Sequence, residues 1–318
     1  MAARRRALPG RLRDIRVALD TTPLRQTRAG TARYVRGLRD HLDVDLVEMS
    51  FPATSRLRTV AADMLWYPRL RSDADVLHCP TFRGPFSAKR PLVVTVHDLA
   101  VLRHPEWFNR WTASYSRFAV PRVVRAASRV IAVSDFTKRE LQSLLDVPES
   151  KIRVIPNGIE DVFTSHGPRA DGDYVLAVGT LEPRKNLERI AQAVDAELRI
   201  AGAKGWRDVR PPANVTWLGD VGDEQLAELY RGARCLVYAS LYEGFGIPVA
   251  EALACGCPVV TSVDTPMAEL APDVTLVDPR DVESIRDGIA RAHRVEARRG
   301  PSWDEVAAQT RAVYEELT

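Results

Sequence analysis

Short apolar runs alternate along the chain with longer segments whose apolar residues recur at helical spacing. Most of the runs are rich in Val and Ile and apolar on both faces, which is typical of buried parallel strands. They predict strands at residues 15–19, 76–79, 92–96, 129–133, 151–155, 174–178, 197–201, 215–218, 235–239 and 258–261. Helices are expected between them at 30–42, 135–145, 186–194, 223–232 and 248–254. This repetition of strand and helix predicts doubly wound α/β sheets.

The strands form two series, separated by a Gly-, Pro- and Asp-rich segment at residues 161–172. We therefore expect two facing Rossmann-like domains with parallel sheets, at residues 1–160 and 170–300. A last helix, within 301–318, has one apolar face that needs a surface to cover. Open α/β sheets bind ligands at the carboxyl ends of their strands, so the cleft between the domains is the expected binding site.

Charge divides the chain into unlike halves. Residues 1–155 hold 28 Lys or Arg against 15 Asp or Glu, and the remainder holds 17 against 27, within a net charge of +3. A basic half favours an anionic partner, such as a membrane surface, a lipid-linked phosphate or nucleic acid, although compositional drift is an alternative. The basic start, residues 1–13, is interpreted as a charged tail without a secretory apolar region. With few cysteines and no long apolar run, the protein is expected in the cytoplasm.

A candidate anion site follows the strand predicted at 174–178, where the chain reads GTLEPRKN before a predicted helix. Amides at a helix N-terminus suit phosphate, and the adjacent cations Arg184 and Lys185 would hold a diphosphate and stabilise its charge as it leaves. Thr180 lies in the same loop and is counted with this site. The alternative is a solvated basic turn, which the position at a strand's carboxyl end disfavours.

A second motif, EGFGIPVAE, runs from Glu243 to Glu251. Gly244 and Gly246, on either side of Phe245, allow backbone amides to approach a ligand closely. Two carboxylates on one loop–helix unit can bind hydroxyl pairs, such as those of a hexose and a ribose. The motif alone leaves an alternative open, in which Glu251 interacts with the helix dipole and Glu243 is a surface residue.

Further candidates lie in the first half. His97 and Asp98 end the strand predicted at 92–96, where His97 would face the cleft and Asp98 would orient its ring or cap the next segment. A structural role for His97 is the alternative. Gly30 opens the first predicted helix and would let the backbone approach phosphates or an acceptor.

Other motifs argue against competing functions. Asp73-Ala74-Asp75 matches a metal-binding D-x-D pattern but precedes a strand, so we interpret it as turn chemistry. Cys255 and Cys257 are interpreted as a buried helix end, since no second Cys or His pair lies nearby, and no metal site is expected. A P-loop, a nucleophile elbow and the dinucleotide GxGxxG are all missing from the sequence. No basic stretch carries the aromatic interleaving of a nucleic-acid surface, so no nucleic-acid partner is expected.

Together these motifs resemble the retaining family 4 glycosyltransferases of the GT-B fold. The resemblance runs nearly end to end and is most specific at residues 217–262, where Glu243 and Glu251 match the family's E-x7-E pair. It is also carried by the segments AGTARYVRGL, DVLHCPTF, VVTVHDLAVLRHPEWF, VIAVSDFTKREL, IRVIPNGIE, AVGTLEPRKNL and SWDEVAAQTRAVYEEL. The resemblance implies that the last helix crosses back onto the first domain, which accounts for its apolar face.

The resemblance also implies roles by position. Arg184 and Lys185 would contact the donor diphosphate, Glu243 and the amides of residues 244–246 would hold the sugar, and Glu251 would hold the ribose. His97 would lie beneath the sugar and Gly30 would line the phosphate side. Ser134 would line the cleft or only cap the helix that follows it. The first domain is short for the family, and Ala32 replaces a common glycine, so the sequence departs from the family on the acceptor side and not at the donor site.

The resemblance implies transfer of a hexose with retention from a nucleotide-sugar to a hydroxyl of a glycan or lipid-linked acceptor. The segments VHDLA and GTLEPRKN are similar to those of bacterial mannosyltransferases of polysaccharide assembly, so GDP-mannose is the expected donor. No resident cofactor or metal is expected. UDP-glucose, UDP-N-acetylglucosamine and dTDP-rhamnose are the alternative donors. A nucleotide-sugar epimerase and a non-catalytic nucleotide-sugar-binding subunit are the alternative functions. Peripheral contact with the anionic inner membrane is expected from the basic half.

Overall fold

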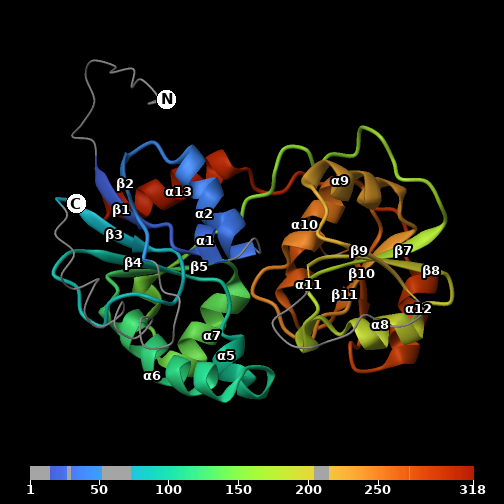
Figure 1. The fold of residues 1–318 in the computed structure, drawn as a ribbon, viewed down its shortest axis with the longest axis horizontal. Coiled ribbons are helices and arrows are strands. Elements are labelled where there is room, and N and C mark those ends of the chain that lie inside the picture. Colours follow the sequence, from blue (N-terminus) through green and yellow to red (C-terminus); the bar gives the residue numbers. More distant parts are fainter. Residues whose placement is uncertain (1–14, 27–29, 52–72, 204–214, 272) are drawn as a thin grey trace.

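The computed structural model describes residues 15–26, 30–51, 73–203, 215–271 and 273–318, so the tail expected at residues 1–13 lies outside it. Within this part the chain forms two parallel six-stranded sheets, with strand orders β2-β1-β3-β4-β5-β6 and β12-β11-β10-β7-β8-β9. Helices cover each sheet, and the two domains lie side by side (Figure 1). In both sheets the crossovers place the buried, Val-rich strands at the centre, as parallel sheets require.

The N-terminal domain contains the first sheet and the helices around it. Its strands are β1 (Arg16–Asp20), β2 (Asp45–Met49), β3 (Val76–Cys79), β4 (Leu92–Val96), β5 (Arg129–Ala132) and β6 (Ile152–Val154). Its helices are α1 (Pro23–Gln26), α2 (Gly30–His41), α5 (Ala100–Arg103), α6 (Arg110–Ala126) and α7 (Asp135–Leu145), with 3₁₀ turns η2 (Pro105–Trp107) and η3 (Glu149–Lys151).

The C-terminal domain repeats this plan. Its strands are β7 (Tyr174–Val178), β8 (Glu197–Ala201), β9 (Thr216–Gly219), β10 (Cys235–Tyr238), β11 (Val259–Ser262) and β12 (Thr275–Val277). Its helices are α8 (Leu187–Ala193), α9 (Asp223–Gly232), α10 (Ile247–Ala254), α11 (Pro266–Leu270) and α12 (Val282–Arg291), with the 3₁₀ turn η4 (Pro183–Lys185). The expected linker segment, residues 161–172, lies between β6 and β7.

The sequence predictions of fold hold, with identifiable errors. All ten predicted strands are present within one or two residues of their expected bounds. Two strands, β2 and β12, and five helices, α1, α5, α6, α11 and α12, were missed. Strand β2 mixes charged with apolar residues, and β12 has only three residues. The expectation of burial on both faces is wrong for β9, which lies at a sheet edge and is partly exposed.

The last helix, α13 (Trp303–Glu315), returns to the N-terminal domain, as expected. It lies beside α2 on the N-terminal half (Figure 1). Ser302 and Glu305 form a reciprocal capping box that begins the helix. Trp303 is buried against Gly37 of α2, where any Cβ would overlap the indole ring. The indole nitrogen donates a hydrogen bond of 3.1 Å to Glu160 in the segment between the domains.

The structure also tests the roles predicted for two short motifs, the D-x-D segment and the cysteine pair. Arg16 at the start of β1 pairs with Asp73, and its backbone amide donates to the Asp75 carboxylate at 2.9 Å. The D-x-D segment therefore performs the strand-entry role expected of it. Cys255 caps the end of α10 and Cys257 is buried beyond it, which agrees with the helix-end interpretation. Within the described ranges, no helix combines the length and apolar character needed to cross a membrane.

Candidate active site

The candidate site is built on two loops that leave neighbouring strands of the second sheet at their carboxyl ends. Strands β7 and β10 are adjacent and parallel, so the loops after Val178 and Tyr238 emerge at one edge. A backbone hydrogen bond of 2.8 Å from the Leu241 amide to the Arg184 carbonyl joins them. This pairing brings the two sequence motifs together, although about 60 residues separate them in the chain.

The loop with the two cations lies before a helix, as predicted, and α8 starts at Leu187, one residue from its expected start. Within the loop, Arg184 and Lys185 belong to the 3₁₀ turn η4. Asn186 lies between η4 and α8 in the left-handed conformation, with φ of 57°. Its side-chain amide donates to the carbonyls of Ala239 and Pro279, at 3.0 and 2.6 Å, which fixes the turn. The cations are therefore positioned by the turn and by the β10 loop, rather than by a helix end.

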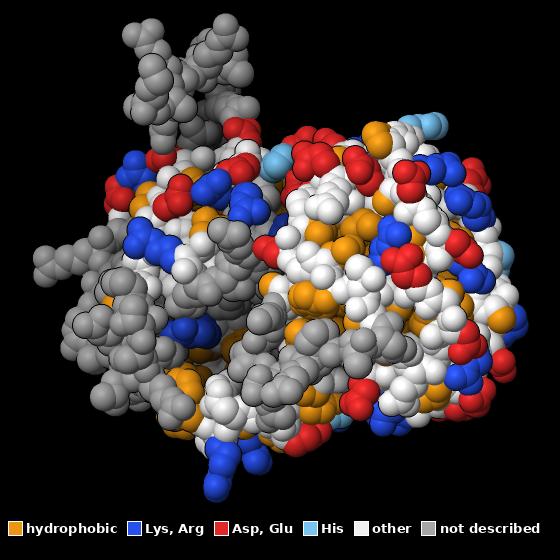
Figure 2. Space-filling view, turned by 45° about the vertical axis from the view of Figure 1, so that its right-hand side comes forward, with side chains coloured by type: hydrophobic (Ala, Val, Ile, Leu, Met, Phe, Trp, Pro, Cys, Tyr) orange, Lys and Arg blue, Asp and Glu red, His pale blue; other side chains and the backbone are white. Residues whose placement is uncertain are grey.

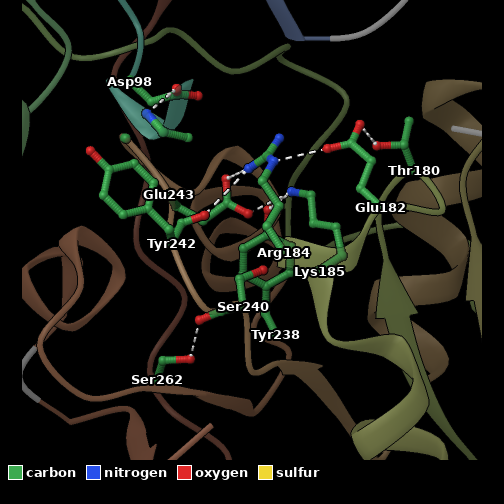
Figure 3. Close-up of polar contacts among 12 residues, drawn as sticks. Asp98, Thr180, Glu182, Arg184, Lys185, Tyr238, Ser240, Tyr242, Glu243 and Ser262 are labelled. Carbon is green, nitrogen blue, oxygen red and sulfur yellow. Dashed lines mark hydrogen bonds and ion pairs between the residues drawn. The ribbon is translucent and has the colours of Figure 1, made fainter. Parts of the chain in front are cut away.

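Glu243 lies between the two cations. Its carboxylate accepts from Arg184 Nη1 at 2.8 Å through one oxygen and from Lys185 Nζ at 2.7 Å through the other. Figure 3 shows the two side chains converging on it. Glu243 is only 7% exposed and Lys185 only 8%. The alternatives of a surface glutamate and a solvated basic turn are therefore both wrong.

Opposing electrostatic effects set the charge of this cluster. Burial alone would raise the pKa of Glu243, but the attraction of Arg184 and Lys185 outweighs it and lowers the pKa to about 2. Burial lowers the pKa of Lys185, and Glu243 opposes that shift. For Arg184, burial acts downward but Glu243 and Asp98 more than compensate, so its pKa is raised. Glu243 is thus an ionised acceptor, held by cations that an anionic ligand would also contact.

Two residues that the sequence analysis did not propose complete this wall. Glu182 is buried and accepts from Arg184 Nε at 2.9 Å and from the Thr180 hydroxyl at 2.5 Å, so Thr180 reaches the site through Glu182 (Figure 3). The hydroxyl of Tyr238 accepts from Lys185 Nζ, whose charge also lies 4.7 Å from the ring centre. Tyr238 ends the strand β10, and its position at a carboxyl end was the available sequence signal.

The N-terminal domain closes over the glycine loop. A Cβ at Gly244 would overlap the carbonyl oxygen of His97, so only glycine fits there. The Gly244 carbonyl accepts from the hydroxyls of Ser134, at 2.5 Å, and Thr137, at 3.1 Å. Ser134 also caps α7 by accepting from the Thr137 amide at 3.0 Å, so its two expected roles coexist. Tyr242 adds a third link by donating to Glu140 at 3.0 Å.

His97 presents its backbone rather than its ring to this loop. Its Nε2 lies 3.1 Å from the Pro80 carbonyl, and its ring packs edge-on against Tyr34 with centroids 4.8 Å apart. Burial lowers the pKa of His97, with the Pro80 carbonyl acting in the opposite direction. Asp98 caps α5 by accepting from the Ala100 amide at 3.0 Å, which agrees with the capping alternative.

Glu251, the second carboxylate of the motif, has a different set of partners. It is 1% exposed, accepts from the Tyr230 hydroxyl at 3.0 Å, and pairs with Arg33 from the other domain. Arg33 also pairs with Asp223. Burial raises the pKa of Glu251 to about 7, although Arg33 and Tyr230 act in the opposite direction. The sequence analysis did not propose Arg33, although it lies within AGTARY.

The remaining candidates line the junction of the two domains. Gly30 begins α2, and a Cβ there would lie 3.6 Å from Ile247, the first residue of α10. Phe245 is buried, and Gly246 adopts φ of 97° to start α10. Among the described residues, no group of three or more His, Cys, Asp or Glu side chains is placed to hold a metal ion. The geometry therefore brings the predicted site residues to the region where the two domains meet, with the cations Arg184 and Lys185 beside the ionised carboxylate of Glu243.

Comparison with known proteins agrees with this arrangement. Residues 13–163 match the family described as Glycosyltransferase Family 4, and residues 158–300 match Glycosyl transferases group 1. O-antigen chain mannosyltransferase B of Escherichia coli is 32% identical over 78% of this chain and 73% of its own. O-antigen chain mannosyltransferase RfbU of Salmonella typhimurium is 28% identical over 66% of this chain and 65% of its own. A structure of Anabaena Alr3699/HepE in complex with UDP-glucose superimposes with a TM-score of 0.66 at 17% identity, covering 95% of each chain.

The fold and site define a two-domain α/β enzyme of the GT-B class, whose two sheets meet at a polar junction. The chain belongs to the family 4 glycosyltransferases and is a bacterial mannosyltransferase-like member of them. The resemblance drawn from the motifs is confirmed.

Proposed function

We propose that this glycosyltransferase moves mannose from GDP-mannose to a hydroxyl of a glycan or lipid-linked acceptor, with retention at the anomeric carbon. The observation that carries the proposal is the buried cluster of Arg184, Lys185 and Glu243 beneath the N-terminal domain. It combines two cations for a leaving diphosphate with an ionised carboxylate for sugar hydroxyls. The relatives named for mannosyl transfer in O-antigen chains support the choice of sugar.

The proposed chemistry assigns each group one task. The donor diphosphate would take over donors of Arg184 and Lys185 that now point at Glu243, and these cations would stabilise the charge on the departing phosphate. Glu243 would accept from hydroxyls of the sugar, and Glu251 from those of the ribose. The His97 carbonyl, which packs against Gly244, would lie on the sugar's far side. The departing phosphate would take the acceptor's proton, in a displacement on one face of the ring.

The first experiment identifies the donor without needing the acceptor. Thermal-shift titrations would compare GDP-mannose, UDP-glucose, UDP-N-acetylglucosamine and dTDP-rhamnose. The largest stabilisation is expected with GDP-mannose. A larger shift with UDP-glucose would replace the proposed donor, in line with the UDP-glucose bound to the structural relative from Anabaena. A nucleotide-sugar epimerase would convert the donor without acceptor, and a non-catalytic subunit would bind the donor without releasing nucleotide.

We further propose that the enzyme works in the cytoplasm, where its N-terminal domain contacts the anionic inner face of the membrane. Helix α6 supports this surface: its sequence contains no acidic residue, and its four arginines are all exposed, namely Arg110, Arg117, Arg122 and Arg125. Phe118 is 41% exposed among them, with the Arg122 guanidinium 3.7 Å above its ring. Basic side chains project at the lower edge of the N-terminal domain in Figure 2. Exposed arginines with an aromatic residue between them suit an anionic lipid surface.

Vesicle sedimentation tests this surface. The wild type is expected to sediment with phosphatidylglycerol vesicles but not with phosphatidylcholine vesicles, and the Arg117→Glu/Arg125→Glu variant is expected to lose that binding. Arg291→Glu/Arg294→Glu changes two exposed arginines of the other domain and serves as the charge-matched control. Equal binding by both variants would contradict the proposal. Competition of vesicle binding by RNA would redirect it to a nucleic-acid surface, because aromatic residues also accompany the arginines of α6.

A further inference from the structure

Arg33 is the side chain through which the N-terminal domain reaches the second carboxylate of the C-terminal site. It extends from the first turn of α2, pairs with Glu251 of α10, and pairs at the same time with Asp223, the first residue of α9. Its side chain is 19% exposed, and its guanidinium lies 5.8 Å from the ring centre of Phe163. The contact spans more than 200 residues of chain, so it exists only when the domains are together.

The Glu251 carboxylate keeps capacity for a ligand despite these partners. An ionised carboxylate offers about four lone-pair positions. Arg33 uses one on Oε1, and the Tyr230 hydroxyl uses one on Oε2. Among the described residues each oxygen thus has one hydrogen-bond partner, and its second position would suit one of two neighbouring hydroxyls such as those of a ribose.

Several charged and titratable groups face Glu251 or Arg33. Tyr230 and Asp223 face Glu251 from α9, and Cys255 follows it on α10. Glu160, in the segment between the domains, adds its charge beside Arg33. Arg33 is the one cation among the described groups that act on Glu251 to lower its pKa, while burial and Asp223 raise it. Without Arg33, a still larger fraction of Glu251 would be neutral near pH 7.

We propose that Arg33 is a positioning residue that completes the ribose site from the other domain, by favouring the ionised form of Glu251 and orienting its carboxylate for the two ribose hydroxyls. This inference rests on the proposed function, in which Glu251 binds the ribose. It makes ribose recognition depend on domain closure, because the cation belongs to one domain and the carboxylate to the other. The diphosphate cations, in contrast, are both paired with a carboxylate of their own domain, Glu243.

A binding cycle isolates this role from a general structural one. Dissociation constants for GDP and 2′,3′-dideoxy-GDP would be measured by calorimetry for the wild type and for Arg33→Met. The variant is expected to bind GDP about 10-fold more weakly, as for a lost hydrogen bond involving a charged group. Its affinity for the dideoxy analogue should change less than about twofold, because no ribose hydroxyl is left to recognise. Arg33→Lys retains the charge and should restore part of the difference.

Arg36→Met removes an exposed arginine from the same helix and is the matched control, with both affinities expected to stay at wild-type values. A second readout is pH. In the wild type, the preference for GDP over its dideoxy analogue should increase as the pH rises through about 7 and Glu251 ionises. In Arg33→Met this increase should move to higher pH. A merely structural role would weaken both nucleotides equally and leave this pH profile in place.

Four results would overturn the inference. Equal weakening of GDP and the dideoxy analogue would make Arg33 structural. Tighter GDP binding by Arg33→Met would show that Arg33 blocks the site instead of completing it. If the wild type binds GDP without preferring the ribose hydroxyls, Glu251 is not a ribose site. If the wild type binds no GDP, the GDP-mannose proposal fails on its own, and UDP with its dideoxy analogue repeats the cycle. Binding of neither nucleotide would reject the proposed function together with this inference.

Discussion

The two carboxylates of one loop–helix motif, Glu243 and Glu251, are both buried, yet their pKa values are shifted in opposite directions. Glu243 contacts two cations of its own domain, and its pKa is lowered to about 2. Glu251 contacts one cation from the other domain, and its pKa is raised to about 7. The difference teaches that burial alone does not decide ionisation, since the number and origin of the compensating cations do. One end of the motif is charged permanently, and the other is charged conditionally.

The largest expected effect comes from removing a permanent cation. Lys185→Ala should lower turnover by about 10² to 10³-fold, because it deletes one stabilising donor to the departing phosphate. The protein should stay folded, since Arg184 still contacts Glu243. Glu243→Ala should nearly abolish turnover for the complementary reason. Steady-state rates with GDP-mannose and acceptor, together with circular dichroism, check both variants.

Lys138→Ala is the control for these rates, because Lys138 pairs with Glu149 on the surface of the other domain. Surface pairs contribute little, so its turnover should stay within about twofold of the wild type. Rates like the wild type's in Lys185→Ala or Glu243→Ala would remove the cluster from the mechanism.

The next effect separates the carboxylates by the pH dependence of stability. The pKa of Glu251 is raised above its unfolded value of 4.5, so its contribution is present below pH 4.5 and lost as pH rises through about 7. The pKa of Glu243 is lowered, so its contribution is present above pH 4.5 and lost as pH falls towards about 2. Each shift corresponds to about 3 kcal/mol at most.

Unfolding by urea between pH 5 and 9 would measure this contrast in the Glu251→Gln and Glu243→Gln variants. Relative to the wild type, Glu251→Gln should gain stability as pH rises to about 7 and then level off. Glu243→Gln should show a constant difference over the same range, because both of the relevant pKa values lie below it. Parallel slopes for the two variants would contradict the assignment of opposite shifts.

This contrast also defines what the sequence can predict. The buried strands were predictable because Val- and Ile-rich runs fit only the centre of a parallel sheet, and the cations and carboxylates were predictable because they follow such strands. Their charge states were not. Arg33 and Glu251 are 218 positions apart, and no local pattern indicates that they meet. Glu182 was missed because a glutamate beside a basic pair is typical of an exposed turn. The sequence therefore indicated most of the residues that meet where the domains join, but not Glu182 or Arg33, nor which domain supplies the partner of each carboxylate.

A smaller effect is expected at the contact that joins the domains over the motif. Gly244→Ala would place a methyl group against the His97 carbonyl, which must move the two domains apart. Turnover should fall about 10- to 100-fold, because small displacements of reacting groups are costly. Gly222→Ala is the control: its methyl group would meet the Glu224 carboxylate at 3.9 Å, an ordinary contact, and its rate should stay close to the wild type's. Equal rates for the two variants would indicate that the contact at His97 is unimportant.

The smallest expected effect concerns the pH at which Glu251 ionises. Asp223 shares Arg33 with Glu251 and is 39% exposed at its side chain, so its charge is screened by solvent. Asp223→Asn removes a negative charge that raises the pKa of Glu251. It also removes the ion pair in which Asp223 competes with Glu251 for Arg33. The rise in GDP preference over the dideoxy analogue should therefore move to lower pH, by less than about one unit. Calorimetric titrations across pH 6 to 8 check the direction. A shift to higher pH would mean that Asp223 orients Arg33 toward Glu251 rather than competing for it.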